Sequence, residues 1–100
     1  MTLLRHTVLL RFKPDATEEQ IEAVLDGLAT MPEKMDFIRR YEFGRDLGIL
    51  EANPQVALVA DFDSAADWRA YQDHPDHKAL VRDSIAPILE TMTRVQYEVR

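Results

Sequence analysis

The stretch Leu3-Leu-Arg-His-Thr-Val-Leu-Leu-Arg-Phe-Lys13 alternates between two kinds of side chain. One face holds an imidazole and three apolar residues: His6, Val8, Leu10 and Phe12. The other face holds Arg5, Thr7, Leu9 and Arg11. A period of two is that of a β-strand with one face against a core. We therefore expect a strand over residues 3–13, with His6 on its apolar face.

A helix start follows this strand. Thr17 and Gln20 have the spacing of a capping box, in which the hydroxyl accepts from an amide of the first turn while the glutamine reaches back. Apolar residues then recur at three- and four-residue steps: Ile21, Val24, Leu25 and Leu28. Such a stripe needs a sheet or another helix to cover it. We expect the first helix to start at this box and to end before Pro32.

Two further segments, 37–45 and 56–63, alternate and predict two more strands. In the later one, the first face is wholly apolar and consists of Val56, Leu58, Ala60 and Phe62. Between them, residues 46–55 contain the turn-forming Gly48, Asn53 and Pro54, but also Leu47, Ile49 and Leu50. This connection is more apolar than a free loop, so we expect something to cover it.

A second helix is predicted from an N-cap at Ser64. Pro75 disfavours helical angles at His74 and suits the first position of a helix, so we expect the helix to break at His74 and to restart through about Ile85. Pro87 predicts another kink or an end.

Residues 92–99 alternate once more and predict a fourth strand, so the expected order is strand, helix, strand, strand, helix, strand. This is the split βαβ order of a ferredoxin-like α+β domain, a four-stranded antiparallel sheet with both helices on one face. We expect residues 1–100 to form one such domain. The uncovered face would expose Leu9, Ala57 and Val59, and an exposed apolar sheet face is more often an interface than bare surface. We therefore predict a homodimer that closes sheet against sheet.

Composition argues against several classes of partner. The 100 residues include 12 Lys and Arg against 18 Asp and Glu, a net charge of -6, which disfavours nucleic acid. No apolar run approaches the roughly 18 to 20 residues of a membrane-spanning helix, and no signal-peptide pattern is visible, so we expect a cytoplasmic protein without a membrane partner. The chain has no cysteine and no glycine-rich phosphate loop, and we expect no cofactor.

The unusual chemistry is concentrated in Tyr71-Gln-Asp-His-Pro-Asp-His77. Tyr71, His74 and His77 are spaced three apart and would share one face of a continuous helix. The break at Pro75 could turn His77 toward the space between helix and sheet, where it could meet His6. A neutral imidazole beside a phenol could remove a proton from an activated carbon while the phenol stabilises the enolate.

A plainer alternative stays open for the same residues. In it, His74 caps or packs at the helix break, Tyr71 is a core aromatic with its hydroxyl at the rim, and His77 lies on the surface. A metal site on His74, His77 and a neighbouring aspartate is a weak match, because it lacks the i, i+4 histidine pair of His-Glu-x-x-His helices. We predict no metal site, and we interpret Trp68 as a core anchor.

The chain resembles the stress-responsive dimeric A/B barrel, or Dabb, domain family over its full length. The resemblance rests on the segments 5–13, 43–44, 62–64 and 71–77. It implies a ferredoxin-like subunit whose sheets pair into a dimeric barrel. Most members of this family resemble small proteins with no assigned reaction, and some are linked to stress responses.

The resemblance also implies a candidate catalytic pair. A plant polyketide cyclase of this family, olivetolic acid cyclase, uses a tyrosine and a histidine as an acid–base pair for aldol closure without a cofactor. The matching positions here are Tyr71 and His77, with His6 matching a further pocket histidine. Two positions that are aromatic in the cyclase are Leu25 and Leu28 here, so its substrate is not carried over.

We therefore expect a homodimer that binds a small, largely apolar ligand in a cleft between helices and sheet. The expected ligand-binding residues are His74, Leu25, Leu28 and Val8. The alternative is a cofactor-free lyase or cyclase, with His77 as general base, Tyr71 as electrophilic partner and His6 orienting a carbonyl. A cofactor-independent monooxygenase rests on analogy of fold alone. A purely structural stress protein is a further alternative.

Overall fold

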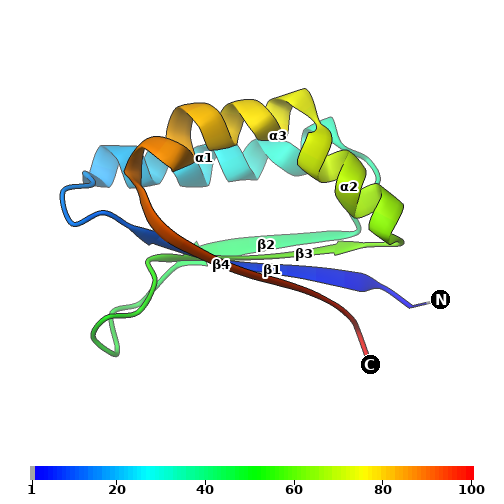
Figure 1. The fold of residues 1–100 in the computed structure, drawn as a ribbon, viewed down its shortest axis with the longest axis horizontal. Helices are drawn as coiled ribbons and strands as arrows, with labels where there is room; N and C mark the ends of the chain where they lie inside the picture. The colour runs from blue at the N-terminus through cyan, green and yellow to red at the C-terminus, as the bar shows by residue number, and fades with distance from the viewer. Residues whose placement is uncertain (1) are drawn as a thin grey trace.

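The structure, a computed structural model, describes residues 2–100; Met1, which belongs to the predicted domain, lies outside the described residues. The elements follow the predicted order (Figure 1). They are β1 (Leu4–Phe12), α1 (Glu18–Lys34), β2 (Arg40–Arg45), β3 (Val56–Phe62), α2 (Ala65–Asp73), α3 (Pro75–Leu80) and β4 (Leu89–Glu98). A π-helical turn, η1 (Val81–Ile85), and a 3₁₀ turn, η2 (Ala86–Ile88), connect α3 to β4.

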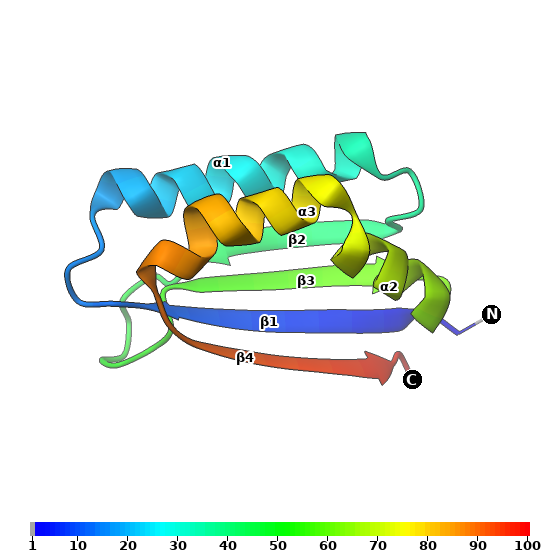
Figure 2. The ribbon, with the colours of Figure 1, turned by 45° about the horizontal axis from the view of Figure 1, so that its top comes forward.

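The four strands form one antiparallel sheet in the order β2-β3-β1-β4. Figure 2 shows α1, α2 and α3 on the same face of this sheet, which we call the inner face. Residues paired across neighbouring strands point to the same face of the sheet. The strand register therefore determines which side chains are neighbours. His6 lies opposite Ala60 on β3 and Gln96 on β4. The predicted ferredoxin-like α+β fold is confirmed.

The core fills the space between the helices and the inner face. Alternate residues of β1 and β3 are buried there: Val8, Leu10, Phe12, Val56, Leu58, Ala60 and Phe62. On the helix side of the core, α1 contributes Ile21, Val24, Leu28 and Met31. Gly27 allows α3 to approach α1, because a Cβ at that position would collide with the side chain of Leu80.

The first helix starts as predicted and ends later than predicted. The Gln20 amide nitrogen donates to Thr17 Oγ1 at 3.1 Å, and the Thr17 amide donates to Gln20 Oε1 at 2.9 Å. The expectation that the helix ends before Pro32 is wrong, since Pro32 lies inside α1. Proline removes one hydrogen bond, but Met31 and Met35 on either side are buried, and the Met35 amide donates to Met31 O at 3.1 Å. Burial of these methionines offsets the local cost.

Apolar residues lie exposed on the other side of the sheet, which we call the outer face. Leu9 is 37% exposed, Val95 53% and Tyr97 45%. Nothing within residues 2–100 covers the connection between β2 and β3, where Leu47 is 85% exposed. No helix in the described chain combines the length and the apolar character needed to cross a membrane.

Candidate functional site

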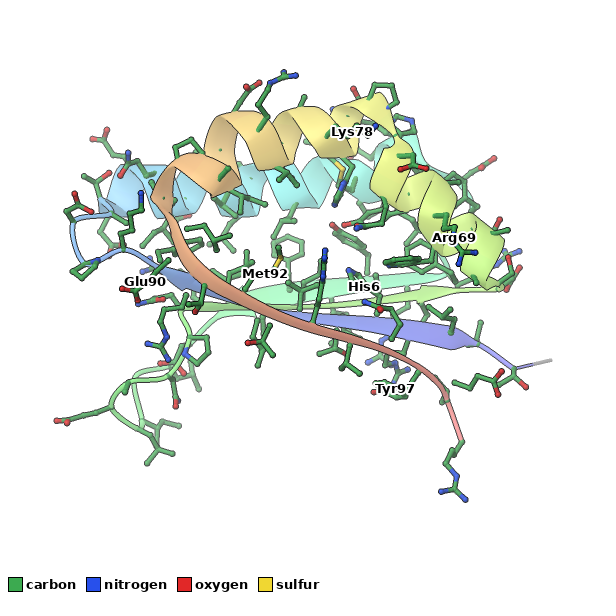
Figure 3. The ribbon with its side chains drawn as sticks, in the orientation of Figure 1. His6, Arg69, Lys78, Glu90, Met92 and Tyr97 are labelled. Atoms are coloured by element: carbon green, nitrogen blue, oxygen red, sulfur yellow. The ribbon has the colours of Figure 1, made fainter. Side chains whose placement is uncertain are left out.

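A cavity of about 330 Å³ lies between the inner face and the segment that runs from α2 to η2. We call it the helix–sheet cavity. Its apolar walls come from both layers: Val8, Leu10, Leu28, Leu58, Val81, Ile85, Ala86, Leu89 and Met92. Its polar lining consists of His6, Tyr71, Gln72, His77, Lys78, Arg82 and Arg94. Figure 3 shows His6 and Met92 between sheet and helices, whereas Tyr97 lies on the outer face.

The helix break brings Tyr71 and His77 together. His74 adopts an extended backbone, with φ -62° and ψ 134°, so α2 stops there and α3 restarts at Pro75. The rings of Tyr71 and His77 have centroids 4.4 Å apart, and both line the helix–sheet cavity. His74 takes another position: its Nδ1 accepts from the Asp76 amide at 3.1 Å and caps α3.

His6 reaches the same cavity from the sheet. Its side chain is buried, and its ring centroid lies 6.2 Å from that of Tyr71 and 5.8 Å from that of Trp68. The side-chain nitrogen of Gln96 lies 2.9 Å from His6 Nδ1. An amide nitrogen can only donate, so Nδ1 accepts and a neutral His6 carries its proton on Nε2.

Burial keeps the three groups uncharged near neutral pH. It lowers the pKa of His6 to about 4, and repulsion by a protonated His77 and by Arg94 would act in the same direction. Burial also lowers the pKa of His77, while a hydrogen bond to the backbone of Gln72 acts in the opposite direction. For Tyr71, burial raises the pKa to about 12. The cavity therefore presents two neutral imidazoles and one protonated phenol.

Comparison with known families decides what kind of domain this is. A family described as Stress responsive A/B Barrel Domain, Dabb, matches residues 4–99. The chain belongs to the Dabb family. No curated protein matches it significantly in sequence.

Solved structures similar to this Dabb chain share its fold. A dimeric ferredoxin-like protein of unknown function from Thermobifida fusca is 39% identical, with a TM-score of 0.90, covering 98% of this chain and 92% of its own. A dimeric protein of unknown function from Bacteroides fragilis is 26% identical, with a TM-score of 0.87 and coverage of 97% and 96%. Hydroxynitrile lyase from Passiflora edulis is 20% identical, with a TM-score of 0.84 and coverage of 98% and 94%; at that identity the likeness concerns the fold alone.

The Dabb chain places only part of the predicted site at the cavity. Tyr71, His77 and His6 line it, as do Leu28 and Val8, but His74 and Leu25 do not. His74 is used as a cap, and Leu25 packs half-buried against the core. Among residues 2–100, no three histidine, aspartate or glutamate side chains lie close enough together to hold a metal ion.

Sequence reasoning missed two residues that contact members of the candidate site, one at Tyr71 and one at His6. The hydroxyl of Tyr41 on β2 lies 2.9 Å from that of Tyr71, and Gln96 on β4 contacts His6. Tyr41 lies in the alternating segment 37–45, but nothing in the sequence indicated which face of that strand was the inner one. Arg94 was also missed, because β4 offers polar residues on its inner face.

Proposed function

We propose that this Dabb chain forms a homodimer whose subunits each bind a small, largely apolar molecule in the helix–sheet cavity. The observation that carries the binding proposal is the cavity itself: about 330 Å³ of space with mostly apolar walls and a few convergent polar groups. Ligand sites in proteins have this composition and begin at about this size.

Blocking the cavity tests the binding proposal. The neutral apolar dye N-phenyl-1-naphthylamine is titrated into the wild-type protein and the bound fluorescence is followed to saturation. Ala86 lies on η2 and lines the cavity, so Ala86→Phe fills part of it; Ala66→Phe, at an exposed position of α2 outside the lining, is the matched control. We expect saturable binding that Ala86→Phe weakens at least about tenfold and Ala66→Phe leaves unchanged. Absence of saturation in the wild type, or equal binding by both variants, contradicts the proposal.

The outer face supports the homodimer. It exposes Leu9, Val95 and Tyr97, and the apolar residues of the connection between β2 and β3 are uncovered within the described chain. The relatives from Thermobifida fusca and Bacteroides fragilis are described as dimeric. Light scattering of the wild type should give twice the mass of one chain. Val95→Asp should give monomers, while Ala23→Asp on the exposed side of α1 should not.

A second candidate function is cofactor-free lyase or cyclase chemistry, and the contact between Tyr71 and His77 favours it. In this reaction class, neutral His77 removes the proton next to a substrate carbonyl. Tyr71 and the Nε2–H of His6 donate to the oxygen on which enolate charge develops. Tyr41 fits this role, because its hydroxyl lies 2.9 Å from that of Tyr71 and, when Tyr41 donates in this hydrogen bond, the proton of Tyr71 is left for the substrate. One of the solved structures with this fold, from Passiflora edulis, is named a hydroxynitrile lyase.

Proton exchange tests the catalytic candidate without a known substrate. The methyl protons of acetophenone are followed by NMR in deuterated buffer with and without the protein. Catalysed exchange should fall about 100-fold or more in His77→Ala and clearly in Tyr71→Phe, while both variants stay dimeric and folded. If wild-type protein gives only the background rate, or if the variants lose stability but not exchange, the binding function stands without the catalytic one.

A further inference from the structure

The helix–sheet cavity has a one-sided charge. The whole chain carries 18 acidic against 12 basic residues. Yet the charged residues that line the cavity are all basic, namely Lys78, Arg82 and Arg94. No aspartate or glutamate lines it. An apolar cavity with a purely cationic rim, in an acidic protein, is the chemical complement of an apolar molecule with an anionic group.

Two of the three cations are unpaired within the described chain. Arg82 forms an ion pair with its neighbour Asp83, at 2.8 Å. Across residues 2–100, no ion pair involves Lys78 or Arg94. An incoming carboxylate would therefore not have to displace a resident one.

Both unpaired cations stand next to the candidate pair and its partner. Lys78 follows His77 directly on α3. Arg94 lies opposite Val8 in the register of β4 with β1, and Val8 is buried on the inner face, so Arg94 projects to the cavity side of an edge strand. Its charge reaches His6, where it helps to lower the pKa of the imidazole. The cations thus flank the polar end of the cavity, while leucines of β1, α1 and β3 form its apolar walls.

We infer that the cavity accepts an amphipathic carboxylate, with its apolar body against Leu10, Leu28 and Leu58 and its carboxylate at Arg94 and Lys78. This inference rests on the proposed binding function and names its ligand class. Lys78 and Arg94 are exposed at the rim, and charge-assisted hydrogen bonds from them give selectivity for the anion over a neutral analogue of the same length.

A pair of probes that differ only in the head group separates this inference from the binding proposal. Octanoate and octan-1-ol are titrated into ¹⁵N-labelled protein, and dissociation constants are taken from amide chemical shifts. The variants are Arg94→Gln and Lys78→Gln. Arg69→Gln is the matched control, because Arg69 is exposed on α2 and lies outside the cavity lining (Figure 3).

We expect wild-type protein to bind octanoate about tenfold more tightly than octan-1-ol, and each cavity variant to lose about three- to tenfold in octanoate affinity alone. Arg69→Gln should bind both probes like the wild type. Rising salt concentration should weaken the binding of octanoate but not that of octan-1-ol, and this measurement needs no variant. Equal affinity for both probes, without an effect of Arg94→Gln, overturns the carboxylate inference and leaves the binding function standing. If neither probe binds, both proposals fail.

Discussion

His6 should make the stability of the fold depend on pH between 7.5 and 5. Its pKa is lowered from 6.5 to about 4, because the folded protein buries the ring. The unfolded chain therefore takes up a proton as the pH falls below 6.5, while the folded chain does not do so until about 4. The contribution of neutral His6 is complete above pH 6.5 and is lost as the pH falls. From the two pKa values the loss at pH 5 is about 2 kcal/mol.

Urea unfolding followed by the fluorescence of Trp68 measures this loss. At one fixed protein concentration, the wild-type midpoint should fall by about 1 M between pH 7.5 and 5. His6→Gln keeps a side chain that can meet Gln96 but cannot titrate, so its midpoint should move much less. His77 contributes in the same direction and is present in both proteins, so it largely cancels in the comparison. If His6→Gln shows the wild-type pH dependence, or if the NMR titration of His6 has a midpoint near 6.5, the account of His6 as a buried neutral ring is refuted.

Three further predictions concern stability. Thr17→Ala removes one half of the capping box and should lower the free energy of unfolding by about 1 kcal/mol, whereas a change below about 0.3 kcal/mol would mean that the box contributes little. Ala52 has a φ of 65°, a conformation that costs a residue with a Cβ about 1 kcal/mol, so Ala52→Gly should raise the thermal midpoint rather than lower it. Tyr41→Phe should lower the free energy of unfolding by about 1 kcal/mol through the lost hydrogen bond to Tyr71, measured by urea unfolding.

Local sequence signals predicted most of the fold because the relevant forces are local. The alternation from His6 to Phe12 fixes which face of β1 is buried, and the structure buries all four of its inner residues. The extended backbone at His74 follows from the clash between Pro75 and the residue before it. Both signals act within a few residues, so no tertiary knowledge was needed to use them.

The errors arose where packing overrides local preference. Pro32 is unfavourable inside a helix, yet α1 continues through it because Met31 and Met35 gain burial on the core. The fourth strand starts at Leu89 rather than at residue 92, since pairing with Phe12 on β1 extends it. His74 lies outside the cavity lining and caps α3, which is the place that the plainer alternative gave it.

The surroundings of the candidate site were less predictable, because they depend on which face of an edge strand points inward. On β4 the inner positions are Met92, Arg94 and Gln96. The outer positions include Val95 and Tyr97 and are no less apolar, so hydropathy does not identify the inner face. Register with β1 decides the question: Gln96 must lie beside His6 and Arg94 beside Val8. A strand that covered the cavity with apolar side chains would have been easy to predict from sequence. The inner face of β4 is polar, so its orientation could not be predicted in this way. The same polar residues supply the hydrogen bond from Gln96 to His6 and the unpaired cation, Arg94, at the cavity.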